Sequence, residues 1–102
     1  MFIHSVYFWL KDGVSNTARL EMMADANEKL REIPTVQQFW AGPPAGTPRD
    51  IVDNSYQIGL TVILEDAEAH EIYQEHPLHQ EFIAKHKINW EKVLVYDFLA
   101  GS

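Results

Sequence analysis

The segment from Phe2 to Leu10 limits most strongly how this chain can fold. It is dense in β-branched and aromatic residues, and the turn residues Lys11-Asp12-Gly13 end it, which is typical of a β-strand. Alternate side chains of a strand point to opposite faces. One face would carry Phe2, His4, Val6, Phe8 and Leu10, and the other Ile3, Ser5, Tyr7 and Trp9. Both faces are substantially apolar, so we expect both to be covered.

The next stretches alternate between helical and strand patterns. Apolar residues recur at three- and four-residue steps over residues 17–33, which predicts an amphipathic helix that Pro34 ends. Its expected inner face is Leu20, Met23, Ala24, Asn27, Leu30 and Ile33. A short strand is predicted over residues 36–40 and a longer one over residues 56–64. The Gly- and Pro-rich residues 42–55 between them read as an irregular loop.

A second helical region opens at Glu65-Asp66 and is expected to break at His76-Pro77. Proline is well tolerated in a first helical turn, so a new helix starting at Pro77 and running through Lys85 is predicted. Residues 93–99 form the last predicted strand. The resulting order, β-α-β-β-α-β, is that of an α+β, ferredoxin-like fold with an antiparallel sheet. At 102 residues, we expect one domain over residues 1–102.

Helices on one side of a four-stranded sheet leave the other sheet face open. Tyr7, Trp9 and part of the last strand would then face water. An exposed apolar face of that size usually marks an interface. We therefore expect a homodimer that pairs through its sheets.

Composition argues against several classes of partner. Eight Lys+Arg against fifteen Asp+Glu give a formal net charge of −7, and the longest basic cluster, residues 85–87, is too sparse for a phosphate backbone. Nucleic acid and anionic membranes are therefore not expected partners. No apolar run approaches the ~20 residues of a membrane span, and no signal peptide is expected. Together with the absence of cysteine, these features favour a cytoplasmic protein.

Five stretches taken in order resemble one known family. They are Met1-Phe2-Ile3-His4-Ser5-Val6, Trp40-Ala41-Gly42, Asn54-Ser55-Tyr56, Tyr73-Gln74-Glu75-His76-Pro77-Leu78-His79, and Trp90-Glu91 before Tyr96-Asp97. Together they are similar to the stress-responsive A/B barrel (Dabb) domain over nearly the whole chain. The Tyr-x-x-His-Pro-x-His element is the most specific of them. The resemblance implies a dimeric α/β barrel, in which two sheets pack face to face.

The resemblance also suggests where chemistry would lie. The family includes plant stress-related proteins and a plant polyketide cyclase in which the Tyr and the second His of this element act, which implies roles for Tyr73 and His79. His4 corresponds to the family's histidine early in the first strand. Where the cyclase has a further pocket histidine, this sequence places Ile58.

The same residues suit acid/base chemistry without a cofactor. Histidine supplies a base near neutral pH, and a tyrosine hydroxyl donates to a developing oxyanion. The predicted pocket would be apolar and fit an aromatic or fatty small molecule. Its expected lining is Ile58, Leu60, Val62, Trp90 and Val95. Structural roles remain open: His76 or His79 as a helix cap, His4 as a core residue, and Tyr73 as a helix anchor.

No metal or cofactor is expected from residue spacing. Gln74 stands where a zinc-binding helix that begins His70-Glu71 would need its second histidine. Asp66 and His70, four residues apart, are better explained as a solvated helix face. Asn89-Trp90 is too little to support a haem site.

Three functions follow from these observations. The first is a homodimeric protein with an apolar pocket, acting as a cofactor-independent cyclase, lyase or isomerase through Tyr73 and His79. The second is a non-catalytic dimer that serves stress protection or ligand binding. The third is a cofactor-free monooxygenase of the antibiotic-biosynthesis type.

Overall fold

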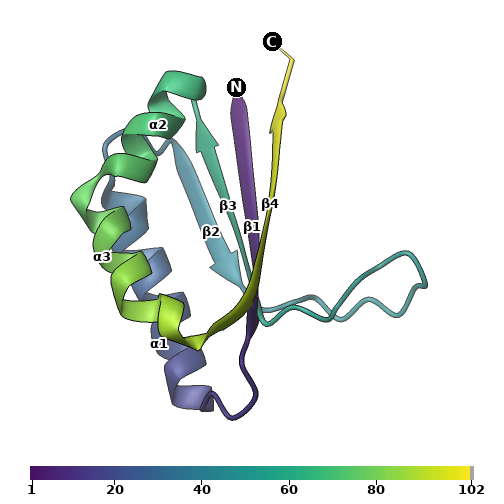
Figure 1. The fold of residues 1–102 in the computed structure, drawn as a ribbon. Coiled ribbons are helices and arrows are strands. Elements are labelled where there is room, and N and C mark those ends of the chain that lie inside the picture. Colours follow the sequence, from purple (N-terminus) through teal and green to yellow (C-terminus); the bar gives the residue numbers. More distant parts are fainter. Residues whose placement is uncertain (102) are drawn as a thin grey trace.

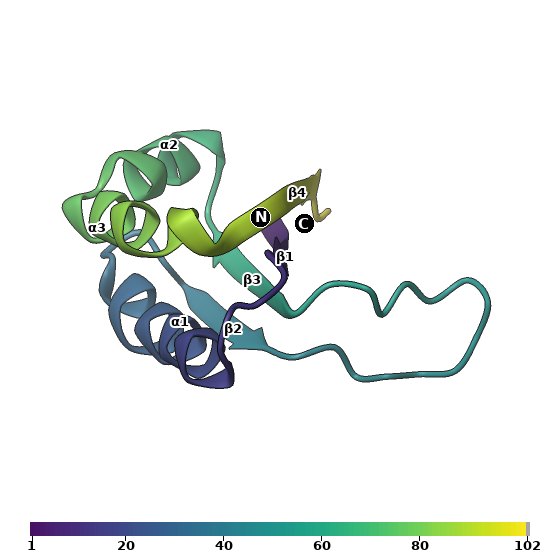
Figure 2. The same cartoon turned by 60° about the horizontal axis from the view of Figure 1, so that its bottom comes forward.

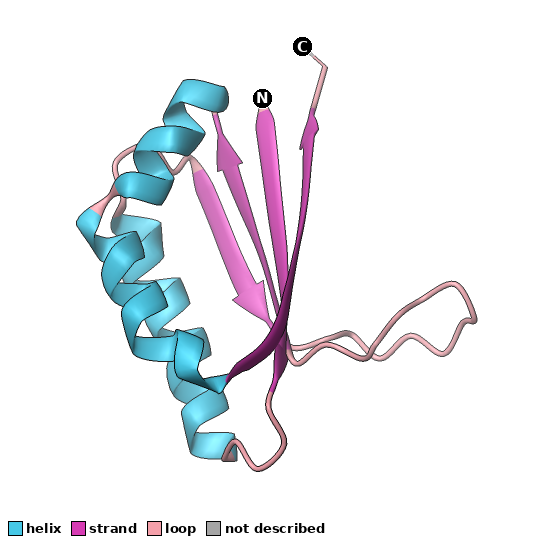
Figure 3. Ribbon diagram, viewed as in Figure 1, coloured by secondary structure: helices cyan, strands magenta, loops and turns pink. Residues whose placement is uncertain are grey.

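The computed structural model describes residues 1–101 and consists of four strands and three α-helices. In chain order these are β1 (Phe2–Leu10), α1 (Asn16–Lys29), β2 (Gln38–Gly42), β3 (Ile58–Leu64), α2 (Ala67–Glu75), α3 (Pro77–His86) and β4 (Trp90–Leu99). The strands form one antiparallel sheet in the order β2-β3-β1-β4. The helices all lie against one face of this sheet (Figure 1 and Figure 3). The predicted ferredoxin-like order, including the split second helix, is confirmed.

β1 is a central strand, paired with β3 on one side and with β4 on the other. Its residues His4, Val6 and Phe8 are buried beneath the helices. Tyr7 and Trp9 lie on the opposite face of the sheet, as the alternation predicted. The first strand therefore has one face in the core and one aromatic face outside it.

The inner face of α1 differs from the predicted one. Met22 and Ala26 are buried, whereas Leu20 is 48% exposed. Met22 and Met23 are both apolar, so the sequence fits two rotations of the helix about its axis. Packing on the sheet selects the rotation that buries Met22. The α-helix also ends at Lys29 rather than at residue 33, and a 3₁₀ turn, η1 (Leu30–Glu32), completes it.

Three strand boundaries also differ from their predictions. β2 starts two residues late because Val36 is held in a turn, where its N–H donates to the Ile33 carbonyl at 3.0 Å. β3 likewise begins at residue 58 rather than at 56. β4 begins early, at Trp90, because pairing with Leu10 extends it. The sequence did not predict this extension because the residues after Trp90, Glu91 and Lys92, are charged.

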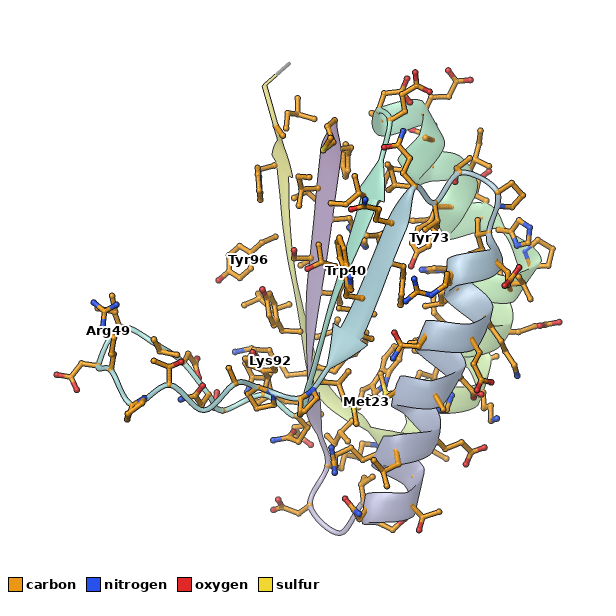
Figure 4. All side chains as sticks on the ribbon, turned by 180° about the vertical axis from the view of Figure 1, so that it is seen from behind. Met23, Trp40, Arg49, Tyr73, Lys92 and Tyr96 are labelled. Carbon is orange, nitrogen blue, oxygen red and sulfur yellow. The ribbon has the colours of Figure 1, made fainter. Side chains whose placement is uncertain are left out.

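Residues 43–57 form a long loop that projects away from the sheet (Figure 2), with Arg49 at its tip (Figure 4). Its base is fixed to β1, because the indole of Trp9 donates to the Ser55 hydroxyl at 2.9 Å. Within residues 1–101, no helix has both the length and the apolar character needed to cross a bilayer.

A polar cluster joins α1 to α3 behind the core. The carboxylate of Asp25 lies 2.7 Å from His86 Nε2 and 2.8 Å from Lys85 Nζ. Burial by itself would raise the pKa of Asp25, but the hydrogen bonds from Lys85 and His86 outweigh it and lower the pKa. The ionised carboxylate therefore contributes to holding the two helices together.

We expect Asp25→Asn to lower the free energy of unfolding by about 1–2 kcal/mol at pH 7, because buried His86 loses its charged partner. The pKa of Asp25 is below 3.8 in the folded chain, so this contribution is complete above that value and is lost as the pH falls through the folded pKa. The difference between the two proteins should narrow below about pH 4. Urea unfolding at several pH values measures it.

Glu21→Gln is the matched control. Glu21 also pairs with Lys85, at 2.8 Å, but its side chain is half-exposed. Its loss should cost less than about 0.5 kcal/mol. Equal effects of the two substitutions would show that the buried pair is not what stabilises the helix contact.

Candidate active site

An apolar cavity of about 180 Å³ lies between the sheet and helices α2 and α3. His4, Val6 and Leu60 line it from the sheet; Tyr73, His79 and Phe82 line it from the helices. Figure 4 shows Tyr73 between the helix layer and the sheet. An apolar cavity of roughly 150 Å³ holds one benzene ring. This cavity is therefore sized for a single-ring or short-chain compound.

The break between α2 and α3 places two of its polar groups. His76 ends α2, and its Nδ1 accepts the Leu78 N–H at 3.1 Å, capping α3 with Pro77 in the first turn. Tyr73 and His79 stand on either side of this break. Their rings meet edge to face, with centroids 4.9 Å apart.

His79 has a ring nitrogen without a partner. Its Nδ1 is buried and makes no hydrogen bond within the described part of the chain. Burial, and to a lesser extent the nearby imidazoles of His4 and His70, lowers the pKa of His79 to about 4. The ring is therefore neutral at pH 7, and it lines the cavity.

Tyr73 has the complementary character. It is 1% exposed, and burial raises the pKa of its phenol. The hydroxyl thus keeps its proton throughout the physiological range. It can donate a hydrogen bond to a ligand oxygen but does not readily become a phenolate.

His4 completes a three-ring group, with its centroid 6.0 Å from that of Tyr73. On its other side, Nδ1 of His4 lies 2.6 Å from Asp97 Oδ1 and 3.2 Å from His70 Nε2. Neither Asp97 nor His70 was a predicted site residue. The strand register pairs His4 on β1 with Asp97 on β4. The one feature of the sequence that could have pointed to Asp97 is that it is a carboxylate on the inner face of an otherwise apolar strand.

The location of His70 corrects one expectation. It was assigned to a solvated helix face, but its ring stacks on Phe2, with centroids 4.5 Å apart. Burial, and then the charge of His4, lowers its pKa. The first turn of α2, capped by Asp66, directs this residue back onto the sheet.

The predicted lining residues divide into two groups. Leu60, Trp90 and Val95 line the cavity. Ile58 and Val62 do not, because both are fully buried in the core between the sheet and the helices. Val93 and Val95 are half-exposed although they lie on the helix-bearing face, so the cavity opens along β4.

The opposite face of the sheet is an aromatic surface. Tyr7 meets Tyr56 edge to face with centroids 5.0 Å apart, and Tyr96 at 6.2 Å. Tyr96 and Phe98 are each 60% exposed, and Figure 4 shows Tyr96 on the side away from the helices. An apolar surface of this kind is typical of an interface.

The comparison with known families identifies the chain. The model of the stress responsive A/B barrel domain (Dabb) matches residues 2–100. The chain belongs to this family. The resemblance seen in the sequence is thereby confirmed. No curated protein matches the Dabb chain in sequence.

Solved structures share its fold over almost the entire chain. The Arabidopsis thaliana protein At3g17210 is 25% identical, with a TM-score of 0.84, covering 100% of this chain and 97% of its own. A dimeric ferredoxin-like protein of unknown function from Thermobifida fusca is 17% identical, with a TM-score of 0.83 and coverages of 97% and 90%. The hydroxynitrile lyase of Passiflora edulis is 15% identical, with a TM-score of 0.83 and coverages of 98% and 93%.

We expect the imidazole of His79 to titrate near pH 4, far below its ordinary value of 6.5. Because the unfolded chain then binds the proton first, His79 should destabilise the folded protein as the pH falls from 6.5 towards 4. NMR of the imidazole protons measures the titration, and His79→Gln identifies the resonance. A midpoint at or above 6.5 would contradict the burial of this ring.

Proposed function

We propose that this Dabb protein is a cytoplasmic homodimer in which each protomer uses Tyr73 and His79 as acid/base groups on a small carbonyl compound. The reaction class would be that of a lyase, cyclase or isomerase. One observation carries the proposal: the ring of His79, whose Nδ1 is buried and unpartnered, lines an apolar cavity beside a protonated tyrosine.

The chemistry follows from the protonation states of the two side chains. Neutral His79 can accept a proton from the carbon next to a carbonyl group. The hydroxyl of Tyr73 can donate a hydrogen bond to the carbonyl oxygen as negative charge develops there. An imidazole with a pKa of about 4 is a weak base. Its proton uptake therefore has to be coupled to that developing charge, which favours the imidazolium ion nearby.

His4 would help to arrange the substrate. Its Nδ1 is held by Asp97, so the ring has a fixed orientation at the cavity wall. This is the arrangement in which a second group orients a catalytic imidazole. The hydroxynitrile lyase of Passiflora edulis shares this fold, so the architecture is compatible with a lyase.

Non-catalytic ligand binding is the second candidate function. The cavity is mostly apolar, and it opens along β4 between half-exposed valines. An apolar cavity of this kind can bind a small molecule without catalysing a reaction on it. Chemistry distinguishes the two functions, because a binding protein needs the cavity walls but does not need a base.

The enzyme proposal predicts proton exchange. The wild type should accelerate deuterium incorporation next to the carbonyl of single-ring aldehydes or ketones in D₂O, followed by NMR. His79→Gln should reduce the rate by about 10²–10⁴, and Tyr73→Phe by about 10²–10³. His76→Asn, which preserves a helix cap outside the cavity, is the control and should keep the wild-type rate.

Two results would contradict the enzyme proposal. One is an equal exchange rate in His79→Gln and the wild type. The other is binding of the same compounds, seen as a rise in melting temperature, with no exchange for any of them. The second result would support the binding function.

Self-association through the aromatic surface is tested separately. The similar protein from Thermobifida fusca is described as dimeric, which supports association of this chain. Trp9→Glu should convert the dimer into a monomer in sedimentation, because it would bury a charge between the sheets. Ile72→Glu is the matched control, since Ile72 is 48% exposed and lies on α2, on the helix side of the sheet. A monomeric wild type, or dissociation of Ile72→Glu alone, would refute this interface.

A further inference from the structure

The cluster beside the cavity shares His4 and Asp97 with the proposed reaction, but its third member, His70, has no part in that reaction. His4, His70 and Asp97 each offer one ligand atom, and these three atoms lie within 4.8 Å of one another. We propose that they form a binding site for a borderline divalent transition metal of the zinc type. This site goes beyond the proposed function and does not depend on it.

The donor set indicates the class of metal. Two imidazole nitrogens and one carboxylate oxygen are the three protein ligands of many zinc sites that keep an open position. Imidazole favours zinc, copper, nickel or iron, whereas magnesium and calcium favour oxygen-only sites. Two nitrogens among three donors therefore favour the first group.

Hydrogen bonding alone satisfies this cluster poorly. Nδ1 of His4 lies 2.6 Å from Asp97 Oδ1 and 3.2 Å from His70 Nε2. A ring nitrogen carries at most one hydrogen, so one proton on Nδ1 has to serve both neighbours. A metal cation in place of this proton would interact with all three donor atoms at once.

Admitting the ion would require movement in two directions: the contact between His4 and Asp97 has to open, and the widest separation in the cluster, within 4.8 Å, has to close. Metal bonds of about 2.0–2.2 Å place neighbouring ligand atoms roughly 3.3 Å apart. The contact between His4 and Asp97 would therefore have to open by less than about 1 Å. The side chain of Asp97 is 34% exposed, so it can adjust more readily than the buried His4. The same exposure gives an ion access from solvent.

His70 is held in place for this role. Its ring stacks on Phe2 at an interplanar angle of 19°, which fixes the plane in which Nε2 points. This orienting contact is a second feature of the site, independent of the three ligand distances.

Sequence spacing gives no sign of this site. His70 is 66 residues from His4, and Asp97 is 93 residues from it. The sequence-based expectation of no metal considered only residues close together in the sequence, on one helix and at the Asn89-Trp90 pair. The site is assembled by β1, α2 and β4 together.

Zinc titration of chelator-treated, tag-free protein by isothermal calorimetry tests the proposal. We expect one Zn²⁺ per chain for the wild type. His70→Ala should weaken binding by more than about tenfold, and Asp97→Asn should do the same. Both positions are partly exposed, so these variants should remain folded, as their unfolding transitions will show. His76→Asn removes a histidine from outside the cluster and should bind zinc as the wild type does.

Two outcomes would overturn the metal site. One is no saturable zinc binding by the wild type below about 100 µM. The other is wild-type affinity in His70→Ala, or an equal loss in His76→Asn, because either would place the zinc elsewhere. Neither result depends on the exchange assay, so the failure of one proposal leaves the other standing.

Discussion

Pairing between the first and last strands is the interaction on which the site depends. It sets His4 opposite Asp97 and Val6 opposite Val95, so that β4 supplies one wall of the cavity. The register shifts between Trp9 and Leu10, which brings Trp90 into the pairing at the other end of the strand. Its ring packs on Phe8 with centroids 4.8 Å apart and closes that end of the cavity. A slip of one residue in β4 would send every one of these side chains to the other face.

The two faces of β1 therefore carry separate properties. Residues of even number form the core and the site, and residues of odd number form the aromatic outer surface. Tyr7 and Trp9 contact Tyr56 at the end of the long loop, so the base of this loop joins the outer surface rather than the cavity. A substitution on the outer face can thus affect association without touching the cavity, and the reverse holds for His79.

Local patterns in the sequence were enough to predict the fold. The two-sided β1, the His-Pro break and the order of helices and strands along the chain all follow from periodicity and turn chemistry. The ends of the elements and the rotation of α1 about its axis were harder to predict. Whether Met22 or Met23 is buried depends on how α1 packs on the sheet. Asn27 shows the same dependence on packing, since its side chain bonds both the N–H and the carbonyl of Ala41 at 3.1 Å and so holds the edge strand to the helix.

The candidate site was only partly accessible for the same reason. Tyr73 and His79 are close in sequence, and their motif marks them. The partners of His4 come from elements far along the chain, and only strand register and the packing of α2 bring them together. Ile58 and Val62 point towards the helices as alternation requires, but alternation does not say where along the strand the helices leave a space.

The chemistry of position 79 argues against a purely structural role for its histidine. The cap of α3 is already supplied by His76, so His79 is not needed there. A buried nitrogen without a partner costs about 1–3 kcal/mol. Leucine at this position would remove that cost. A residue that lowers stability in the wall of an apolar cavity is typical of a functional site, where local consistency is given up for function.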